Sequence, residues 1–218
     1  MKWCVLVIAI DFGLISYKED SFKVLKDYFT RKNIEYFIQE TPPELLIRKN
    51  AHPSWAKLLA HSIVPGYDFI ILWDLDLLPK NKDVDIIQHF DMNKLCLAWD
   101  TFARFHHKMN NAEQYLYSYK TFKYNCGLIG IPSHMSSFFE EIFMKYAPGK
   151  KESYEQYYVN DEIYDKKIDI CELPDDYNCF YNTGDWKNSR LIHYTGSKEA
   201  KDNIKVHVEN YFNHLNYI

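Results

Sequence analysis

Two aspartates that directly follow an apolar run are the residues best suited to chemistry in this 218-residue sequence. The run Asp68-Phe-Ile-Ile-Leu-Trp73 predicts a buried strand, and Asp74 and Asp76 come straight after it, on either side of Leu75. In an extended chain, residues two apart point to the same side, so both carboxylates can approach one cation. Such oxygen ligands suit Mg²⁺ or Mn²⁺, which commonly bridges phosphate groups and neutralises charge on a leaving group. We therefore expect a metal site at this pair.

Other polar residues also follow apolar runs. Asp11 follows the first run, Asp100 follows the run 94–99, and His193 lies in the run 191–194. In open α/β sheets, ligands bind outside the carboxyl ends of the strands. These side chains are therefore expected to converge with Asp74 on one site, where His193 can supply a nitrogen ligand to the same metal.

The elements that must position these residues alternate between strands and helices. Strands are expected at 3–10, 34–38, 68–73, 94–99, 125–131, 168–171 and 191–194, and helices at 21–30, 54–63, 133–146, 153–164 and 204–215. Ser54 is expected to cap the second of these helices. This alternation predicts an α/β domain with a mainly parallel central sheet flanked by helices. The sequence contains no internal repeat, no low-complexity linker and no clear domain boundary.

Composition excludes several classes of protein. A net charge of -4 without a dense basic tract argues against nucleic-acid binding. Five cysteines, an odd number with no C-x-x-C pair, argue against a disulfide framework or a structural zinc site and favour a reducing compartment. The first apolar run is too short for a signal peptide, and no stretch is long enough to span a membrane. We expect a soluble, cytoplasmic protein.

Several short motifs occur in a fixed order around the two aspartates, and together they resemble the GT-A fold glycosyltransferases, whose D-x-D motif Asp74 to Asp76 matches. Three of the further matching pieces are Trp55-Ala56-Lys57, similar to a W-A-K helix, Asn125-Cys126-Gly127, similar to an N-x-G segment, and Glu155-Gln156 with Asn160, similar to [D/E]-Q-x-x-x-N. The last piece, His193-Tyr-Thr-Gly196-Ser-Lys198, resembles the H-x-x-G-x-x-K element of the glycogenin-like and bacterial galactosyltransferase group, but is one residue shorter. The resemblance covers about residues 3–200.

The resemblance implies a single GT-A (Rossmann-like) domain over 1–218, with a nucleotide-binding half at about 1–100 and an acceptor- and sugar-binding half at about 101–218. It implies Mn²⁺ or Mg²⁺ held by Asp74, Asp76 and His193. The residues implied to bind the nucleotide-sugar donor are Ile10, Asp11, Phe12, Lys57, Asp74, Leu75, Asn125, Gly127, Gly196 and Lys198. The residues implied to act at the reacting sugar are Glu155, Gln156 and Asp100.

The reaction expected by resemblance is the transfer of a hexose from a nucleotide-diphosphate sugar, by default a UDP-sugar, to an acceptor hydroxyl with retention of configuration. The acceptor is expected to be a glycan or glycoprotein, as for surface-glycan enzymes of bacteria and large DNA viruses. The stretch 101–124 is the candidate acceptor loop. An inverting enzyme would instead need a general base, for which Asp161 and Glu162 are the rival candidates. The segment from Leu173 to Asn178 resembles a loop that returns near the site, and no chemistry is assigned to it.

Two alternatives stay open from the residues alone. A sugar nucleotidyltransferase would share the sheet, the metal and the nucleotide, but it normally needs a Gly-rich basic loop after the first strand. The stretch from Asp11 to Lys18 has one glycine and no arginine. The other alternative is a catalytically inactive sugar-nucleotide-binding module on the same scaffold, and the intact motifs argue against it.

Overall fold

The computed structural model describes residues 1–10, 17–100, 123–147, 155–183, 186–195 and 198–213. Its centre is a six-stranded sheet with the order β2-β1-β3-β6-β5-β7. The strands are β1 (Trp3–Ile8), β2 (Tyr36–Gln39), β3 (Phe69–Asp74), β5 (Leu95–Trp99), β6 (Tyr124–Pro132) and β7 (Ile170–Leu173). All of them run parallel except β6, which is antiparallel to both of its neighbours, β3 and β5. The predicted α/β class with a mainly parallel sheet is confirmed.

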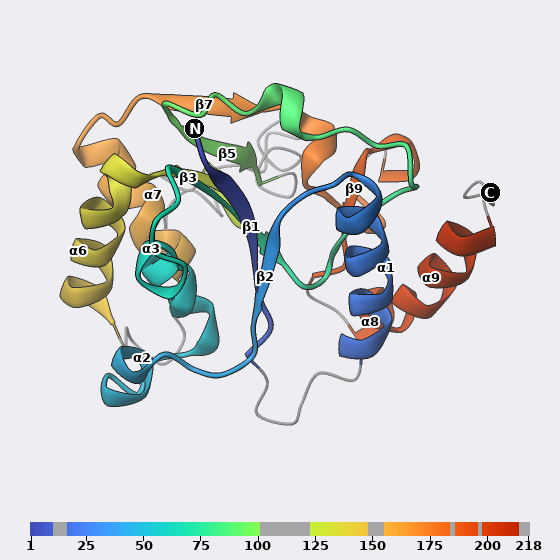
Figure 1. The fold of residues 1–218 in the computed structure, drawn as a ribbon, viewed down its shortest axis with the longest axis horizontal. Coiled ribbons are helices and arrows are strands. Elements are labelled where there is room, and N and C mark those ends of the chain that lie inside the picture. Colours follow the sequence, from blue (N-terminus) through green and yellow to red (C-terminus); the bar gives the residue numbers. More distant parts are fainter. Residues whose placement is uncertain (11–16, 101–122, 148–154, 184–185, 196–197, 214–218) are drawn as a thin grey trace.

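Helices cover both faces of this sheet (Figure 1). On one side lie α1 (Lys18–Arg31), α8 (Lys198–Asp202) and α9 (Ile204–Asn213), and on the other lie α2 (Glu44–Arg48), α3 (Ala60–Ile63), α6 (Ser136–Tyr146) and α7 (Glu155–Asp165). Each face has its own apolar core. Trp73 packs edge-on against Phe29 on the α1 side, and Trp55 packs edge-on against Phe143 on the α6 side. Because β1 and β3 are covered on both faces, they are almost continuously apolar.

The helix expected at 54–63 differs from the prediction. It begins as a 3₁₀ helix, η1 (Pro53–Leu59), and becomes α-helical only in α3. Its cap is His52, whose Nδ1 accepts a hydrogen bond from the Ser54 backbone N–H at 3.3 Å, so Ser54 is not the cap. Pro53 in the first position suits this start, because its missing N–H needs no partner there. Trp55 enters the core and Lys57 is buried at the end of the large sheet.

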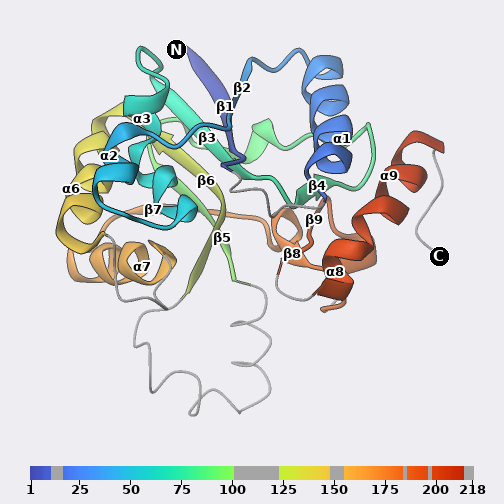
Figure 2. The same ribbon diagram turned by 90° about the horizontal axis from the view of Figure 1, so that it is seen from below.

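A second, three-stranded sheet was not expected. It has the order β4-β9-β8, formed by β4 (Leu77–Pro79), β9 (Leu191–His193) and β8 (Cys179–Phe180). The strand expected at 191–194 therefore belongs to this small sheet and not to the large one. Figure 2 shows the small sheet beside α8 and α9, at the end of β3. Its strands are only two or three residues long, too short for a periodic signal in the sequence.

Four short 3₁₀ turns complete the described chain: η2 (Ile87–His89), η3 (Ser133–Met135), η4 (Asp175–Tyr177) and η5 (Trp186–Asn188). None of the helices among the described residues combines the length and the apolar character that crossing a membrane requires.

Candidate active site

The two aspartates of the D-x-D motif lie where the chain leaves the large sheet for the small one. Asp74 is the last residue of β3, and Leu75 and Asp76 form a turn into β4. Asp76 is thus not in an extended chain as the sequence predicted, because β4 must turn aside to pair with β9. The Trp73 indole N–H closes this turn by donating to the Leu77 carbonyl at 2.6 Å.

The small sheet brings His193 to the same point. β4 and β9 pair with Leu77 opposite His193, so the histidine lies next to the turn that holds Asp76. His193 Nε2 lies 3.2 Å from Asp76 Oδ1 and 3.9 Å from Asp74 Oδ2. One ligand atom from each of the three residues lies within 4.8 Å of the others. Two carboxylates and an imidazole in this arrangement fit Mn²⁺ or Mg²⁺.

A buried lysine balances part of the negative charge at this site. Lys57 Nζ lies 2.6 Å from Asp74 Oδ1 and 3.3 Å from Glu155 Oε1, and it donates to the Cys126 carbonyl at 3.0 Å. Burial lowers the pKa of Lys57, but Asp74 and Glu155 raise it by more, so the pKa is above its usual range. Lys57 is therefore charged at neutral pH.

The same environment acts on the aspartate beside it. Burial raises the pKa of Asp74, and the neighbouring Asp76 raises it further, while Lys57 and His193 oppose this only in part. A carboxyl group with a raised pKa binds a proton more readily, and a divalent cation competes with that proton.

Residues of α7 and β6 lie beside the two aspartates and His193 and form another wall of the same site. Asp100 lies directly after β5 and is 4% exposed, and it accepts a hydrogen bond from Gln156 Nε2 at 3.3 Å. The side-chain oxygen of Gln156, Oε1, in turn accepts from the Cys126 backbone N–H at 3.0 Å. Asn160 Oδ1 accepts from the Tyr124 N–H at 2.8 Å, and its amide donates to the Tyr124 carbonyl at 2.9 Å. The Q-x-x-x-N pattern thus fastens α7 to β6 and orients Asp100.

Glu155 is the first residue of α7 and is 3% exposed. Its Oε1 faces Lys57, whereas its Oε2 has no hydrogen-bond partner within the described part of the chain. An unpartnered buried acceptor costs about 1–3 kcal/mol. A ligand hydroxyl at this oxygen would remove that cost.

Gly127 was expected to leave room for the donor sugar. A Cβ at Gly127 would lie 2.6 Å from His193 Cε1 and 2.7 Å from Asn125 Oδ1. The absence of a side chain therefore makes room for the imidazole ring of His193. Asn125 is itself fixed, because its Oδ1 accepts from the Gly127 N–H at 2.7 Å.

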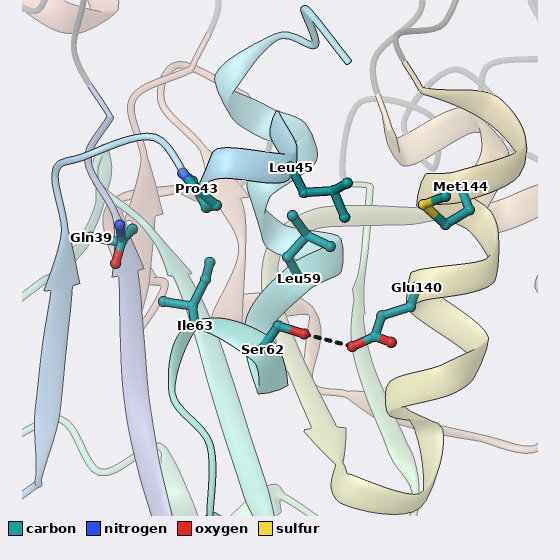
Figure 3. A pocket seen from close by; sticks show the side chains of 8 residues that line it. All are labelled: Gln39, Pro43, Leu45, Leu59, Ser62, Ile63, Glu140 and Met144. Atoms are coloured by element: carbon teal, nitrogen blue, oxygen red, sulfur yellow. Dashed lines mark hydrogen bonds between the residues drawn. The ribbon is translucent and has the colours of Figure 1, made fainter. Parts of the chain in front are cut away.

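These side chains surround a cavity of about 330 Å³. It is lined by Ser54, Lys57, Asp74, Asp100, Asn125, Glu155, Gln156, Tyr157, Phe180, His193 and Thr195. Two cavities of about 390 Å³ and 580 Å³ lie elsewhere, and none of the residues predicted to bind the metal, the donor or the reacting sugar lines them. The first lies between α2, α3 and α6, where Ser62 donates to Glu140 at 2.7 Å (Figure 3). The smallest of these three cavities is therefore the one lined by residues predicted to bind the metal and the sugar.

Comparison with known proteins gives the fold. No protein-family model matches this sequence, and neither does any curated protein sequence. The chain resembles a glycosyltransferase involved in the glycosylation of the major capsid of PBCV-1, with a TM-score of 0.64 and 15% identity over 93% of this chain and 99% of that chain. It resembles the galactosyltransferase LgtC with a TM-score of 0.52 and 12% identity over 96% of both chains. For mouse xyloside xylosyltransferase 1 the TM-score is 0.51 and the identity 12%, over 92% of this chain and 99% of that chain.

The chain has the GT-A fold. The resemblance stated from the sequence motifs is confirmed at the level of the fold. The carboxyl end of β3 in this GT-A fold holds the D-x-D pair, and the small sheet adds the histidine.

Not every predicted residue lies in the described part of this GT-A fold. Asp11, Phe12, Gly196 and the stretch 101–122 lie outside the described residues. Ile10 and Leu75 are described, and each is 4% exposed beside the end of its strand.

The two rivals for a general base do not line the cavity. Asp161 is exposed on α7. Glu162 is bound from the other side of that helix, by Lys145 Nζ at 2.7 Å and by the Tyr146 hydroxyl at 2.7 Å.

The sequence analysis missed two residues near the three candidate metal ligands. Lys201 Nζ lies 3.6 Å from Asp76 Oδ2 and donates to the Tyr17 hydroxyl at 3.1 Å, whereas the predicted Lys198 is exposed on the same helix. The missing residue in the H-x-x-G-x-x-K element was the one sign in the sequence that Lys198 departs from the family's pattern. The other missed residue is Asn178, whose Oδ1 lies 2.7 Å from His193 Nδ1.

Proposed function

We propose that this protein is a metal-dependent glycosyltransferase that moves a hexose from a UDP-sugar to an acceptor hydroxyl, with retention of configuration. The observation that supports it best is the convergence of Asp74, Asp76 and His193 beside a buried polar cavity in a GT-A fold. A metal-dependent sugar transfer would use both parts: the cation at the diphosphate and the polar groups around the sugar.

In this proposal Asp74, Asp76 and His193 hold the metal. Bound there, Mn²⁺ or Mg²⁺ would offset the negative charge that grows on the departing nucleoside diphosphate. Lys201 joins Lys198 as a candidate to hold a phosphate oxygen, because it lies at the D-x-D pair.

The sugar would lie against the wall formed by α7 and β6. Asp100 and Asn125 are buried and fixed by hydrogen bonds, so they can orient sugar hydroxyls without being reorganised. Glu155 offers its unpartnered oxygen beside them. Gln156 acts through Asp100, which it orients.

The nucleotide and the acceptor are proposed from the resemblance to glycosyltransferases. Asp11 is a carboxylate after the first strand, where this fold receives a base and ribose, and no extended guanine-reading set accompanies it. LgtC was solved in complex with donor and acceptor sugar analogs, and the other glycosyltransferase is involved in the glycosylation of the major capsid of PBCV-1. A glycan or glycoprotein acceptor follows by analogy.

The direct test is a donor screen. The purified chain is incubated with a set of UDP- and GDP-sugars and Mn²⁺, and the released nucleotide is measured with and without EDTA. Release of UDP that EDTA abolishes is the expected result. Full release in EDTA, or preference for a GDP-sugar, contradicts the corresponding part of the proposal, and binding without release favours the inactive module.

Retention has a separate test. Proton NMR of the first-formed product, or of the slow hydrolysis product before mutarotation, gives the anomeric configuration. The same configuration as in the donor is expected. An inverted product would move the base role to a carboxylate outside the cavity wall described above.

A further inference from the structure

The segment from Leu173 to Asn178 is a part of the sequence to which the proposed function assigns no task. It follows β7, passes through η4 and ends at Asn178, directly before β8. Asn178 is fully buried, at 0% exposed, and its Oδ1 lies 2.7 Å from His193 Nδ1. Asn178 is thus an amide in contact with the imidazole of a proposed metal ligand.

We propose that Asn178 is a positioning residue that selects the ring orientation and tautomer in which His193 binds a divalent cation through Nε2. This inference rests on the proposed metal site. It goes beyond it by assigning the His193 hydrogen-bond partner, which no motif in the sequence identifies as functional.

The hydrogen bond between His193 Nδ1 and Asn178 Oδ1 allows only one tautomer of an imidazole that binds a metal through Nε2. An amide oxygen only accepts, so the contact with Asn178 Oδ1 requires Nδ1 of His193 to carry its hydrogen. A neutral imidazole with a proton on Nδ1 has its lone pair on Nε2. That nitrogen is the one that faces Asp76 and Asp74.

The surroundings of the ring explain why one hydrogen bond is decisive. The missing side chain of Gly127 admits the ring on one side, and Phe180 packs edge-on against it with centroids 5.3 Å apart and planes at 81°. These apolar and backbone contacts confine the plane of the ring, but they do not distinguish its two orientations related by a half-turn. Only a polar partner distinguishes a ring nitrogen from a ring carbon. Asp76 Oδ1 lies 3.2 Å from Nε2, but a cation bound at Nε2 would replace that contact, whereas the contact of Nδ1 with Asn178 Oδ1 at 2.7 Å would be kept.

The pairing of β8 with β9 also fixes the position of Asn178 relative to His193. Phe180 is opposite His193 in the β8–β9 pair, and the Tyr181 N–H donates to the His193 carbonyl at 3.0 Å. Asn178 enters β8 directly, so its position relative to the histidine is set by strand register. A partner of this kind typically changes metal affinity by about 10–100-fold when it is removed.

The first experiment is calorimetric titration of the whole chain with Ni²⁺ and with Mg²⁺. Ni²⁺ favours imidazole, and Mg²⁺ is satisfied by oxygen ligands. In Asn178→Leu we expect Ni²⁺ affinity to fall by about 10–100-fold and Mg²⁺ affinity to fall less. Asn178→Asp keeps an acceptor and is expected to restore Ni²⁺ binding. A purely structural role would weaken both metals together.

The matched control is the adjacent buried residue. Tyr177→Phe removes a hydrogen bond from the same loop, the one to the Asp85 carbonyl at 3.0 Å, without touching the histidine. It should leave the ratio of the two affinities unchanged. Should Asn178→Leu fail to fold, the Ni²⁺ and Mg²⁺ affinities are compared in Asn178→Ala, whose side chain is smaller.

A second readout observes the tautomer itself. Proton–nitrogen correlation NMR of the Zn²⁺-bound chain, with His193→Gln to assign the signal, is expected to show the His193 hydrogen on Nδ1. A hydrogen on Nε2, or wild-type Ni²⁺ affinity in folded Asn178→Leu, overturns the inference while leaving the metal site standing. Failure of the unchanged protein to bind any of these metals overturns both the inference and the proposed metal dependence.

Discussion

The large and the small sheet of this protein contribute in opposite ways. The large sheet supplies most of the apolar core, with β1 and β3 packed between helices on both faces, but only Asp74 of the three proposed metal ligands lies in one of its strands. The small sheet has strands of two or three residues, yet β9 contributes His193, the turn into β4 holds Asp76, and Asn178 precedes β8. The apolar core is therefore concentrated at the large sheet, whereas the small sheet positions two of the three proposed metal ligands. The following changes test that division.

The largest effect is expected at the turn into the small sheet. Asp76→Asn removes a charge from the proposed metal site with little change in shape, so turnover should fall by about a hundredfold or more while the fold is kept. Steady-state kinetics with the donor found in the screen measure turnover, and circular dichroism measures whether the fold is kept. Asp169→Asn is the control, because that aspartate has a 77% exposed side chain at the large-sheet edge. A large loss of stability in Asp76→Asn would show that the turn supports the fold as well.

The wall beside the large sheet should show the next effect. Glu155→Gln keeps the size of the side chain but weakens its acceptor and its pairing with Lys57, so turnover should fall by about tenfold or more with little change in UDP affinity. Kinetics and calorimetry with UDP and Mn²⁺ separate these quantities. Unchanged turnover would remove Glu155 from the site.

Two glycines of β6 compare the regions within one strand. Gly127→Ala places a methyl group 2.6 Å from His193 Cε1, whereas Gly130→Ala places one 2.5 Å from Phe69 Cζ in the core. We expect Gly127→Ala to weaken metal binding by about tenfold, and Gly130→Ala to lower the free energy of unfolding by about 1–3 kcal/mol without changing metal affinity. Metal titration and urea unfolding of both variants measure this. If both variants gave the same phenotype, the division between the sheets would not hold.

The smallest expected effect at neutral pH is that of replacing His207, which contacts β4 of the small sheet from α9. The effect on stability changes as the pH falls. His207 on α9 is fully buried, accepts from the Tyr194 hydroxyl at 2.9 Å, and donates to the Pro79 carbonyl at 3.0 Å. Burial lowers the pKa of His207 from 6.5 to about 3. The unfolded chain therefore binds a proton first, and stability present above pH 6.5 is lost as the pH falls toward 3, by about 1.4 kcal/mol per unit.

Urea unfolding at pH 7 and pH 5 checks this. The wild type should lose about 2 kcal/mol more than His207→Gln between these pH values. Because His61 and the carboxylates titrate equally in both proteins, the difference isolates His207. Equal pH dependence of the two proteins would mean that this histidine is not the acid-sensitive support.

Much of the fold was predictable because its elements are local. Apolar runs predicted β1, β3 and β5, and the structure moved their bounds by only a few residues. The helix at 54–63 was predicted as one α-helix and is largely 3₁₀, because Pro53 and the His52 cap set its start. The D-x-D pair was visible because it follows a buried strand, although the sequence predicted an extended chain where the structure has a turn.

The sequence by itself determined the α/β class, the position of Asp74 and Asp76 at a strand end, and the pairing of Gln156 with Asn160 on one helix, since each depends on residues close along the chain. His193 was expected near this pair, but only the tertiary structure decided that a small sheet brings it against Asp76, 117 residues away. Only the tertiary structure placed Asn178 against its ring and Lys201 beside Asp76. It also decided that Gly127 makes room for the histidine. The reason is physical: two- and three-residue strands have no hydrophobic period, and their pairing is fixed by the packing of the whole domain and not by their own residues.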